Sequence, residues 1–267
     1  MTSIGRLGLS RIPFTREFDH CDHVKWPFIN DEVDRLLRTV KSRMSAALIA
    51  PAGNGKTVAL RTLAKKLPEA SYHVSYIKVT SLSRRDMCRE IAAAIGAKSA
   101  GTYPSLVRSV QQRLDTELGN EGRRPVLLID EAHDMRPETL AMLRILTNFD
   151  MDSRLVVSLV LVGQPTLKTM LAMPELSEIS SRLNHCGEIR LLTREESYRY
   201  LDHRCRSAGA SGNLFDEDAV EGVFEITRGN MRAIDRLALE AIYELAEMGG
   251  DKVTPEIVVK VRARLWI

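Results

Sequence analysis

Apolar and polar residues follow two kinds of pattern along the chain up to about residue 192. Short, fully apolar runs occupy Ala46–Ala50, Val126–Ile129 and Leu155–Val162, and Tyr72–Thr80 alternates and is rich in β-forming residues. Fully apolar runs of this length are typical of strands buried in a parallel sheet, and alternation is typical of a strand with one exposed face. The pattern therefore predicts a strand over each of these ranges.

Segments with apolar residues at helical spacing separate the predicted strands. The first has an apolar face from Val33 to Val40, with Asn30 as its N-cap. Further helices are predicted over Thr57–Leu67, Leu82–Ile95, Pro104–Leu118 and Pro137–Phe149. Strands that alternate with helices imply an α/β fold, in which a parallel sheet is sandwiched between helices.

From Thr193 onward the pattern predicts helices only. Thr193 and Glu196 fit a capping box at the start of a helix that runs to about Ala208. Two more helices are predicted over Asp216–Thr227 and Met231–Met248. Thr254-Pro255 then opens a last helix, which is predicted to continue to the C-terminus. We therefore expect an N-terminal extension over residues 1–27, an α/β core over 28–192 and a small all-helical lid over 193–267.

Composition excludes several classes of protein. The 267 residues are 44% hydrophobic, which is ordinary for a globular chain, and no apolar stretch approaches the length of a membrane span. There is no secretory signal pattern, and the four cysteines have no CxxC spacing, so we expect a cytoplasmic protein with reduced thiols and no membrane. With 38 Lys and Arg against 35 Asp and Glu, the net charge is only +3, so binding of nucleic acid would need a local basic face.

The strongest chemical signal follows the first predicted strand. The sequence Ala50-Pro51-Ala52-Gly53-Asn54-Gly55-Lys56-Thr57-Val58 matches the end of a phosphate-binding loop and lies between a strand and a helix, as that motif requires. Glycines let backbone N–H groups converge on phosphate oxygens, Lys56 adds a charge for the terminal phosphates, and the Thr57 hydroxyl can bind Mg²⁺. Ala50 replaces the first glycine, which is acceptable if its backbone is unstrained. We expect ATP and Mg²⁺ at this loop.

Two further strands end in polar residues. Asp130 and Glu131 come directly after Val126–Ile129, and Gln164 follows Leu155–Val162. In an open α/β sheet, ligands bind at the carboxyl ends of the strands. Asp130 can hold Mg²⁺, Glu131 can orient or deprotonate the attacking water, and Gln164 can bind that water or the γ-phosphate. The alternative is that Gln164 is simply a turn residue after the strand and binds neither the water nor the phosphate.

The order of these motifs resembles the AAA+ ATPase superfamily. Gly229-Asn230-Met231-Arg232 looks like the sensor-2 motif of that superfamily, which implies that Arg232 reaches the nucleotide phosphates. Arg182, in Ile179-Ser180-Ser181-Arg182-Leu183, lies where such proteins carry an arginine finger, which acts on the ATP of a neighbouring subunit. Either arginine could instead form a surface ion pair.

Within that superfamily, the chain is most similar to the ExeA/TniB/TnsC/MuB-like group. The resemblance rests on Asp130-Glu131-Ala132-His133, on Leu161–Leu167 and on Ser181-Arg182-Leu183 followed by Leu191-Leu192-Thr193. It implies an ATPase of DNA transposition that oligomerises with ATP on double-stranded DNA as a ring or filament. It also implies a transposase and a target-selection protein as partners.

Two other functions remain open. The ExeA branch of the same group drives assembly of a secretion or envelope apparatus, but its members continue into a transmembrane segment and a peptidoglycan-binding region. This chain ends after the lid, which favours transposition. A helicase or initiator loader of the replication type is the third hypothesis.

The resemblance also indicates where DNA would bind. The segment after the strand Tyr72–Thr80 corresponds to the channel-facing region of the group, and its basic and hydroxyl side chains suit phosphate contacts: Lys78, Thr80, Ser83, Arg84 and Arg85. The alternative is that Arg84 and Arg85 simply open a solvated helix.

The N-terminal extension carries four aromatic residues without a steady period: Phe14, Phe18, Trp26 and Phe28. They could form a strap on the core or a surface for a partner, and we favour the strap. His20, Cys21 and His23 lie close together in the same segment, but no second ligand pair follows, so a metal site is not expected.

Overall fold

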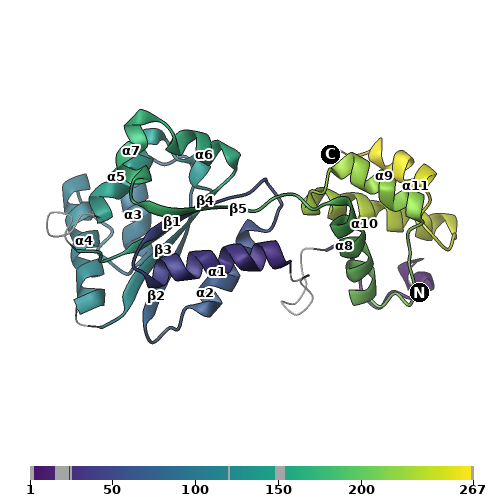
Figure 1. Ribbon diagram of the computed structural model, residues 1–267, viewed down its shortest axis with the longest axis horizontal. Helices are drawn as coiled ribbons and strands as arrows, with labels where there is room; N and C mark the ends of the chain where they lie inside the picture. The colour runs from purple at the N-terminus through teal and green to yellow at the C-terminus, as the bar shows by residue number, and fades with distance from the viewer. Residues whose placement is uncertain (1–2, 16–23, 25, 120, 148–153, 266–267) are drawn as a thin grey trace. The chain divides into compact units, whose positions relative to one another are not determined.

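The computed structural model describes residues 3–15, 24, 26–119, 121–147 and 154–265. The chain forms two compact units (Figure 1). The sheet unit comprises Pro27–Pro51 and Gly55–Ile189, and the helical unit comprises Met1–Trp26, Ala52–Asn54 and Arg190–Ile267. The phosphate loop is thus divided, since residues 52–54 belong to the helical unit and residues 55–58 to the sheet unit.

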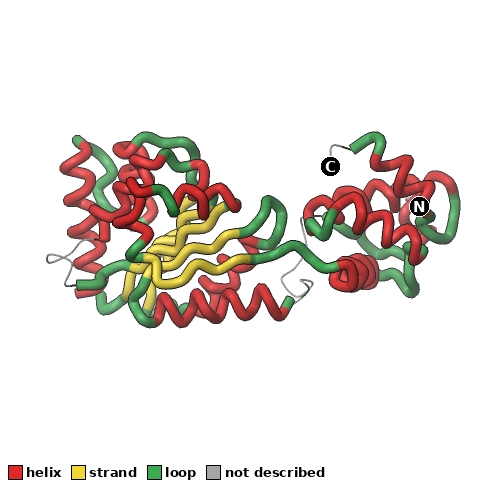
Figure 2. Tube along the Cα trace, turned by 45° about the horizontal axis from the view of Figure 1, so that its top comes forward, coloured by secondary structure: helices red, strands yellow, loops and turns green. Residues whose placement is uncertain are grey.

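A parallel sheet with the strand order β2-β3-β4-β1-β5 lies at the centre of the sheet unit (Figure 2). Its strands are β1 (Ser45–Ile49), β2 (Tyr72–Lys78), β3 (Arg124–Asp130), β4 (Ser158–Gly163) and β5 (Leu183–Glu188). Their carboxyl ends lie at one edge of the sheet, where Lys78 is in register with Asp130, and Ile49 with Gly163. The predicted α/β fold is confirmed.

Helices cover both faces of this sheet (Figures 1 and 2). One face carries α1 (Pro27–Lys41) and α2 (Lys56–Lys66). The other face carries the remaining helices: α3 (Arg84–Ala94), α4 (Tyr103–Gly119), α5 (Pro137–Thr147), α6 (Pro165–Leu171) and α7 (Ser177–Ser180). A right-handed crossover produces this division, because β1 to β2 runs in one direction across the sheet and all later connections run in the other.

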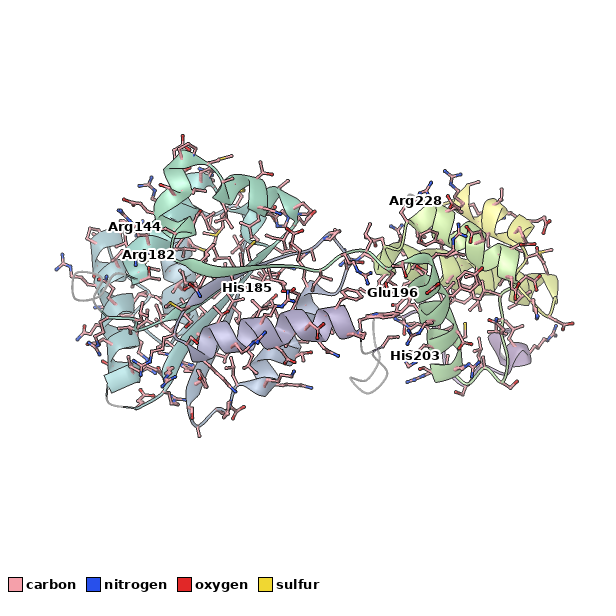
Figure 3. All side chains as sticks on the ribbon, viewed as in Figure 1. Arg144, Arg182, His185, Glu196, His203 and Arg228 are labelled. Atoms are coloured by element: carbon pink, nitrogen blue, oxygen red, sulfur yellow. The ribbon has the colours of Figure 1, made fainter. Side chains whose placement is uncertain are left out.

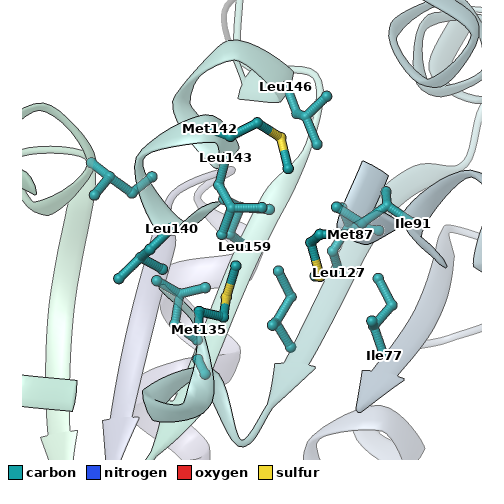
Figure 4. Close-up of a cluster of buried hydrophobic side chains, with 14 of the residues drawn as sticks. Ile77, Met87, Ile91, Leu127, Met135, Leu140, Met142, Leu143, Leu146 and Leu159 are labelled. Carbon is teal, nitrogen blue, oxygen red and sulfur yellow. The ribbon is translucent and has the colours of Figure 1, made fainter. Parts of the chain in front are cut away.

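The main hydrophobic core lies between the sheet and the larger helical layer (Figure 4). Leu127 and Leu159 project from neighbouring strands onto Met87, Ile91 and Leu143, and all five side chains are fully buried. Each of these side chains contributes roughly 1.5–3 kcal/mol through burial. This core fixes the strands whose ends carry the candidate site.

The helical unit contains α8 (Arg194–Ser207), α9 (Glu217–Thr227), α10 (Met231–Met248), α11 (Pro255–Arg262) and a short 3₁₀-helix over Ser3–Leu7. The predicted capping box is confirmed, because the Thr193 hydroxyl accepts a hydrogen bond from the Glu196 N–H and the Glu196 carboxylate accepts one from the Thr193 N–H. Helix α10 has the predicted bounds and ends at Gly249, which adopts the left-handed conformation of a C-cap.

The N-terminal segment packs as a strap within the helical unit. Phe14 is buried and meets Phe215 edge to face, with ring centroids 6.5 Å apart. The buried guanidinium of Arg204 lies 5.4 Å from the Phe14 ring centroid, and Arg199 lies 5.9 Å from the Trp26 ring centroid. The described part of the segment therefore packs as a strap on the helical unit, whereas a strap on the α/β core was expected; Phe18 lies outside the described residues.

Three predicted elements differ from the structure. Helix α1 begins at Pro27, so Asn30 lies inside it and is not its N-cap. Strand β4 begins only at Ser158, and Leu155–Val157 precede it. Helix α11 ends at Arg262 rather than at the C-terminus, and Phe149 lies outside the described residues.

One strand was not predicted from the sequence pattern. Residues Leu183–Glu188 form β5 at the edge of the sheet, next to β1. The segment is polar and only its Gly187 is buried, so it carries no apolar signal. An edge strand needs only one hydrogen-bonded neighbour, and β1 provides it.

Among the described residues, no helix is both long and apolar enough to cross a membrane, and no group of His, Cys, Asp and Glu could hold a metal ion. Cys88, Cys186 and Cys205 are free thiols. His20, Cys21 and His23 lie outside the part of the chain that the structure describes.

Candidate nucleotide site

The phosphate loop leaves β1 in line with the sheet. The Ala50 N–H donates to the Gly163 carbonyl oxygen at 3.0 Å, and Ala50 is not among the residues with positive φ, so alanine is accommodated without strain at the position of the first glycine. Gly55 has φ 84° and is the N-cap of α2, where it offers no side-chain acceptor. The first N–H groups of α2 are therefore left for an anion.

Lys56 begins α2 and is almost fully buried. Its Nζ donates to the carbonyl oxygens of Ala50 at 3.2 Å and Pro51 at 3.3 Å, so the ammonium group lies against the start of the loop. Thr57 is exposed and Val58 is half-buried. The loop thus presents a cation, backbone donors and a hydroxyl, which are the groups that fit a polyphosphate with Mg²⁺.

The loop residues that belong to the helical unit are held by two asparagines. Asn54 is completely buried, its Nδ2 donates to the Arg190 carbonyl oxygen at 2.5 Å, and its Oδ1 accepts from the Met231 N–H at 3.4 Å. Asn230 caps α10 and donates through Nδ2 to the Ala52 carbonyl oxygen at 2.8 Å. The loop and the N-terminus of α10 therefore satisfy each other's polar groups.

Gly53 lies directly against Arg232 in the first turn of α10. A Cβ at Gly53 would fall 2.4 Å from the Arg232 Cβ and 3.1 Å from its Nε, and Gly53 has φ 79°. Only glycine fits at this position, because a side chain would both clash and strain the backbone. Arg232 is exposed and makes no hydrogen bond or ion pair with the described residues, and its side chain lies on the phosphate loop.

Asp130 and Glu131 end β3 as predicted. Asp130 is buried; its Oδ2 accepts from the Tyr76 hydroxyl at 2.9 Å and its Oδ1 accepts from the Glu131 N–H at 2.9 Å. These two bonds fix the plane of the carboxylate. Partial burial, followed by the hydrogen bond and charge of Asp130, raises the pKa of Tyr76 to about 12, so the phenol stays a donor.

Gln164 comes to the same edge of the sheet, because β4 is the neighbour of β3. Its side chain contacts another residue: Nε2 of Gln164 lies 2.6 Å from Nε2 of His133, which belongs to the short helix Ala132–Asp134 after Glu131. Glu131 has φ 57°, an unusual conformation for a residue with a side chain. The ends of β3 and β4 thus form one polar cluster.

A cavity of about 660 Å³ lies between α2 and β2 and extends from Thr57 and Tyr76 to Tyr72 and Arg123. Thr57 and Tyr76, the tyrosine that holds Asp130, therefore border the same cavity. Oxygen ligands of this kind suit Mg²⁺.

Arg182 lies away from this site within the sheet unit. It follows α7 and immediately precedes β5, whose first residue, Leu183, is in register with Ser45 at the start of β1 (Figure 3). The phosphate loop follows the other end of β1, a strand of 5 residues. At a rise of about 3.3 Å per residue the two ends are roughly 16 Å apart. Arg182 therefore does not join Lys56 of its own chain.

The candidate DNA segment begins beside Asp130. Lys78 is the last residue of β2, and the Val79 N–H donates to the Asp130 carbonyl oxygen at 2.9 Å. Lys78, Thr80 and Arg84 are exposed, and neither Lys78 nor Arg84 has a hydrogen bond or ion pair with the residues described. Their charges are thus directed to solvent.

The other two residues of that segment have structural partners. Ser83 is the N-cap of α3, where it accepts from the Asp86 N–H at 3.2 Å and donates to the Asp86 carboxylate at 2.6 Å. Arg85 is exposed and donates to the Gly101 carbonyl oxygen at 3.1 Å. Ser83 and Arg85 therefore help to define the helix start and its neighbouring loop.

The sequence pattern does not point to Tyr76 or to the burial of Asn54. It contains His133 and Asn230 within motifs but indicates no role for either side chain. Tyr76 carries a weak signal, since it lies in the second half of a predicted strand, Tyr72–Thr80. The contacts of Tyr76 and His133 depend on the order of the strands, which the sequence alone does not state.

A parallel sheet of this order, with a phosphate loop after one central strand and an acidic pair after another, defines the P-loop ATPases. A family model described as "AAA domain" matches residues 38–171, half of the chain. The chain therefore belongs to the AAA domain family, and it is an AAA+ ATPase domain that uses ATP with Mg²⁺.

Two curated proteins are similar in sequence. General secretion pathway protein A of Aeromonas hydrophila is 29% identical over 209 residues, which make up 77% of this chain and 38% of that protein. A "Potential ATP-binding protein" of Staphylococcus aureus is 24% identical over 145 residues, 53% of this chain and 51% of that protein. The chain thus spans about half, or less, of the length of these relatives.

Solved structures show the same fold. Cdc6p of Pyrobaculum aerophilum has a TM-score of 0.74 at 17% identity and covers 95% of this chain, which covers 70% of it. The ORC1 protein of Aeropyrum pernix, solved in complex with DNA, has a TM-score of 0.67 at 18% identity, with coverages of 92% and 68%. The RuvB branch migration motor of Thermotoga maritima has a TM-score of 0.61 at 20% identity, with coverages of 94% and 73%. At these identities the likeness concerns the fold alone.

Proposed function

We propose that the protein regulates DNA transposition: it oligomerises on double-stranded DNA with ATP, recruits or activates a transposase at the target, with or without a target-selection protein, and disassembles on hydrolysis. The observation that carries the proposal is the exposed basic segment that begins beside Asp130, through the Val79–Asp130 hydrogen bond. In this proposal, a displacement of Asp130 on ATP binding or hydrolysis would displace the segment through the hydrogen bond between Val79 and Asp130.

In the proposed reaction, the loop amides and Lys56 bind the phosphates of ATP. Thr57 and Asp130 would hold Mg²⁺, which neutralises charge on the phosphates when bound. Glu131 orients the attacking water as a general base, and Gln164 binds that water or the γ-phosphate. The polar cluster at the ends of β3 and β4 supports these roles, since both side chains lie at the same edge as the loop.

Two arginines complete the proposed site. Arg232 acts on the nucleotide of its own chain, which its packing on Gly53 supports. Arg182 acts on the ATP of a neighbouring subunit, because it lies at the opposite end of β1 from its own phosphate loop. ATP then stabilises the oligomer, and hydrolysis weakens it.

DNA binding in this proposal depends on repetition. Each subunit offers a few phosphate contacts, with Lys78 and Arg84 as the main cations and Thr80, Ser83 and Arg85 as further contacts. An oligomer on DNA multiplies these weak contacts, and such contacts do not read sequence. A net charge of +3 is sufficient in this proposal, because Lys78, Arg84 and Arg85 lie within one short segment.

A second candidate function is supported by the relative from Aeromonas hydrophila, whose printed name is that of a general secretion pathway protein. In that case the chain would be the ATPase part of a protein that assembles a secretion or envelope apparatus. Its similarity over 77% of this chain is the specific observation in its favour. An initiator-type function is supported by the fold alone.

Measurement of ATP hydrolysis with and without random-sequence duplex DNA separates the two candidates. The transposition proposal expects stimulation by DNA, and loss of that stimulation in Lys78→Gln/Arg84→Gln with the basal rate kept. The matched control is Arg38→Gln/Lys41→Gln, which removes the same charge from exposed positions on α1. Equal rates with and without DNA, together with no DNA binding in ATP, would contradict the proposal and favour the secretion candidate.

A further inference from the structure

We propose that His133 is a positioning residue that couples Gln164 to Glu131, so that the group facing the γ-phosphate sets the orientation of the general base. This inference rests on the proposed roles of Glu131 and Gln164. It adds a residue to which no role has been given above. The imidazole lies within reach of both side chains.

The position of His133 makes this coupling possible. Its side chain is 10% exposed and lies between the ends of the neighbouring strands β3 and β4. Nε2 lies 2.6 Å from Nε2 of Gln164, and Nδ1 lies 3.4 Å from Oε2 of Glu131. The exposed carboxylate of Asp134 is further away, at 3.6 Å from Nε2.

The chemistry of the Gln164 contact selects one tautomer of His133. An amide nitrogen only donates, so Nε2 of the imidazole must accept, and the ring proton is then on Nδ1. That N–H faces Oε2 of Glu131. Both atoms, Oε2 of Glu131 and Nδ1 of His133, are buried and have no other hydrogen-bond partner among the described residues. Closing this contact by a few tenths of an ångström satisfies both groups and leaves Oε1 for water.

The backbone around this cluster is rigid. Glu131 adopts φ 57° and ψ 35°, a conformation that persists only where neighbouring structure enforces it. The Asp134 N–H donates to the Glu131 carbonyl oxygen at 2.9 Å, which closes the turn. A Cβ at Gly163 would lie 3.2 Å from the backbone nitrogen of His133, so β4 approaches the turn closely. The side chains can therefore reorient on a fixed frame.

The arrangement acts as a relay. When the Gln164 amide turns its N–H toward a phosphate oxygen, Nε2 of His133 loses its donor. The imidazole is then free to change its hydrogen bonds, and the Glu131 carboxylate follows. The presence or absence of the γ-phosphate is thereby transmitted to the base.

A double-mutant cycle of ATP hydrolysis tests this coupling. His133→Ala and Gln164→Ala should each lower kcat by about 10-fold to 100-fold, as for other residues that orient a reacting group, with little change in KM for ATP. The double variant should be no slower than the slower single variant. If the two losses multiply, the residues act independently and the proposal is overturned.

Three further variants make the outcome specific. His133→Asn keeps an acceptor and a donor and should recover much of the lost rate, whereas failure of this rescue with a normal Tm would count against the relay. His185→Ala is the control: His185 lies on β5 and pairs with Glu32 of α1, so its removal should leave the rate unchanged. Glu131→Gln separates the two proposals: if it abolishes hydrolysis while His133→Ala does not affect it, only the relay is wrong, and if it leaves hydrolysis intact, the proposed role of Glu131 is wrong.

Discussion

The sheet unit and the helical unit differ in the way that their polar side chains are paired. The sheet unit supplies the reactive groups, which come from the ends of strands far apart in sequence: Lys56, Asp130, Glu131 and Gln164. In the helical unit, the polar side chains of Asn54 and Asn230 are paired and join residues 52–54 to the start of α10 and to Arg190. In the sheet unit, Oε2 of Glu131 and Nδ1 of His133 are buried and have no hydrogen-bond partner among the described residues.

This difference predicts different effects of mutation. Unpaired polar groups are retained where they react or bind, at a cost in stability. Paired and buried polar groups hold a conformation, and their removal costs stability. Substitutions of Glu131 and His133 should therefore change the rate of hydrolysis, and substitution of the buried and paired Asn54 should change the free energy of unfolding.

The largest effect is expected at Arg182. Arg182→Ala should lower kcat by about 10³-fold or more, as for other arginine fingers. Because the finger is proposed to act on a neighbour, mixing Arg182→Ala with Lys56→Ala should restore part of the activity that each variant lacks. Steady-state phosphate release from the separate and mixed proteins measures this. Full activity of Arg182→Ala alone would remove the role in the neighbour's site.

The next effect is expected in the helical unit, at Asn54. Asn54→Ala leaves the Arg190 carbonyl oxygen and the Met231 N–H without their partner, which should lower the free energy of unfolding by about 1–3 kcal/mol. Urea titration measures this loss. The control is Asn213→Ala, an exposed asparagine in the same unit, which should change stability by less than about 0.5 kcal/mol. Equal losses in the two variants would contradict the distinction between the units.

A smaller effect is expected at Tyr76, which holds Asp130. Tyr76→Phe should raise the Mg²⁺ concentration for half-maximal hydrolysis by about 10-fold, because the carboxylate loses a bond that orients it. The pKa of Tyr76 is raised to about 12, so the hydroxyl remains protonated and the effect should be the same at neutral and mildly alkaline pH. Tyr72→Phe, on the same strand, is the control. A Mg²⁺ dependence that does not shift would show that Tyr76 does not position Asp130.

The smallest effect concerns Glu196 in the capping box of α8 (Figure 3). The hydrogen bond from Arg190 lowers the pKa of Glu196 below its ordinary value of 4.5, so the carboxylate stabilises the folded state above that pH and loses this effect as the pH falls through its folded pKa. Glu196→Gln should cost about 1 kcal/mol at neutral pH. Urea titrations should show the difference shrinking as the pH falls below 4.5; a difference that grows in acid would have the wrong sign.

The sequence predicted the strands that are buried and the motifs at their ends, because both leave strong local signals. The apolar run Val126–Ile129 followed by two acids is an example, and the structure has β3 there. The polar edge strand β5 left no such signal, since its stability comes from pairing with β1. The early start of α1 at Pro27 was missed, because Asn30 is a good N-cap residue in isolation.

The fine structure of the site could not be predicted for a related reason. His133 meets Gln164 because β3 and β4 are neighbours, and Tyr76 meets Asp130 because β2 is on the other side of β3. The order of strands in a sheet is a long-range property, and a single sequence states only the strands themselves. The division of the phosphate loop between the units has the same cause, since it depends on the contacts of Asn54 with residues far along the chain.

The most direct test of the proposed function is sedimentation of Glu131→Gln protein with a labelled random-sequence duplex in the presence of ATP or ADP. We expect large protein–DNA assemblies with ATP that persist in this variant and are absent with ADP, and no assemblies with Lys56→Ala in either nucleotide. Assemblies of equal size in ATP, ADP and the Lys56→Ala protein, or none under any condition, would contradict ATP-controlled assembly on DNA.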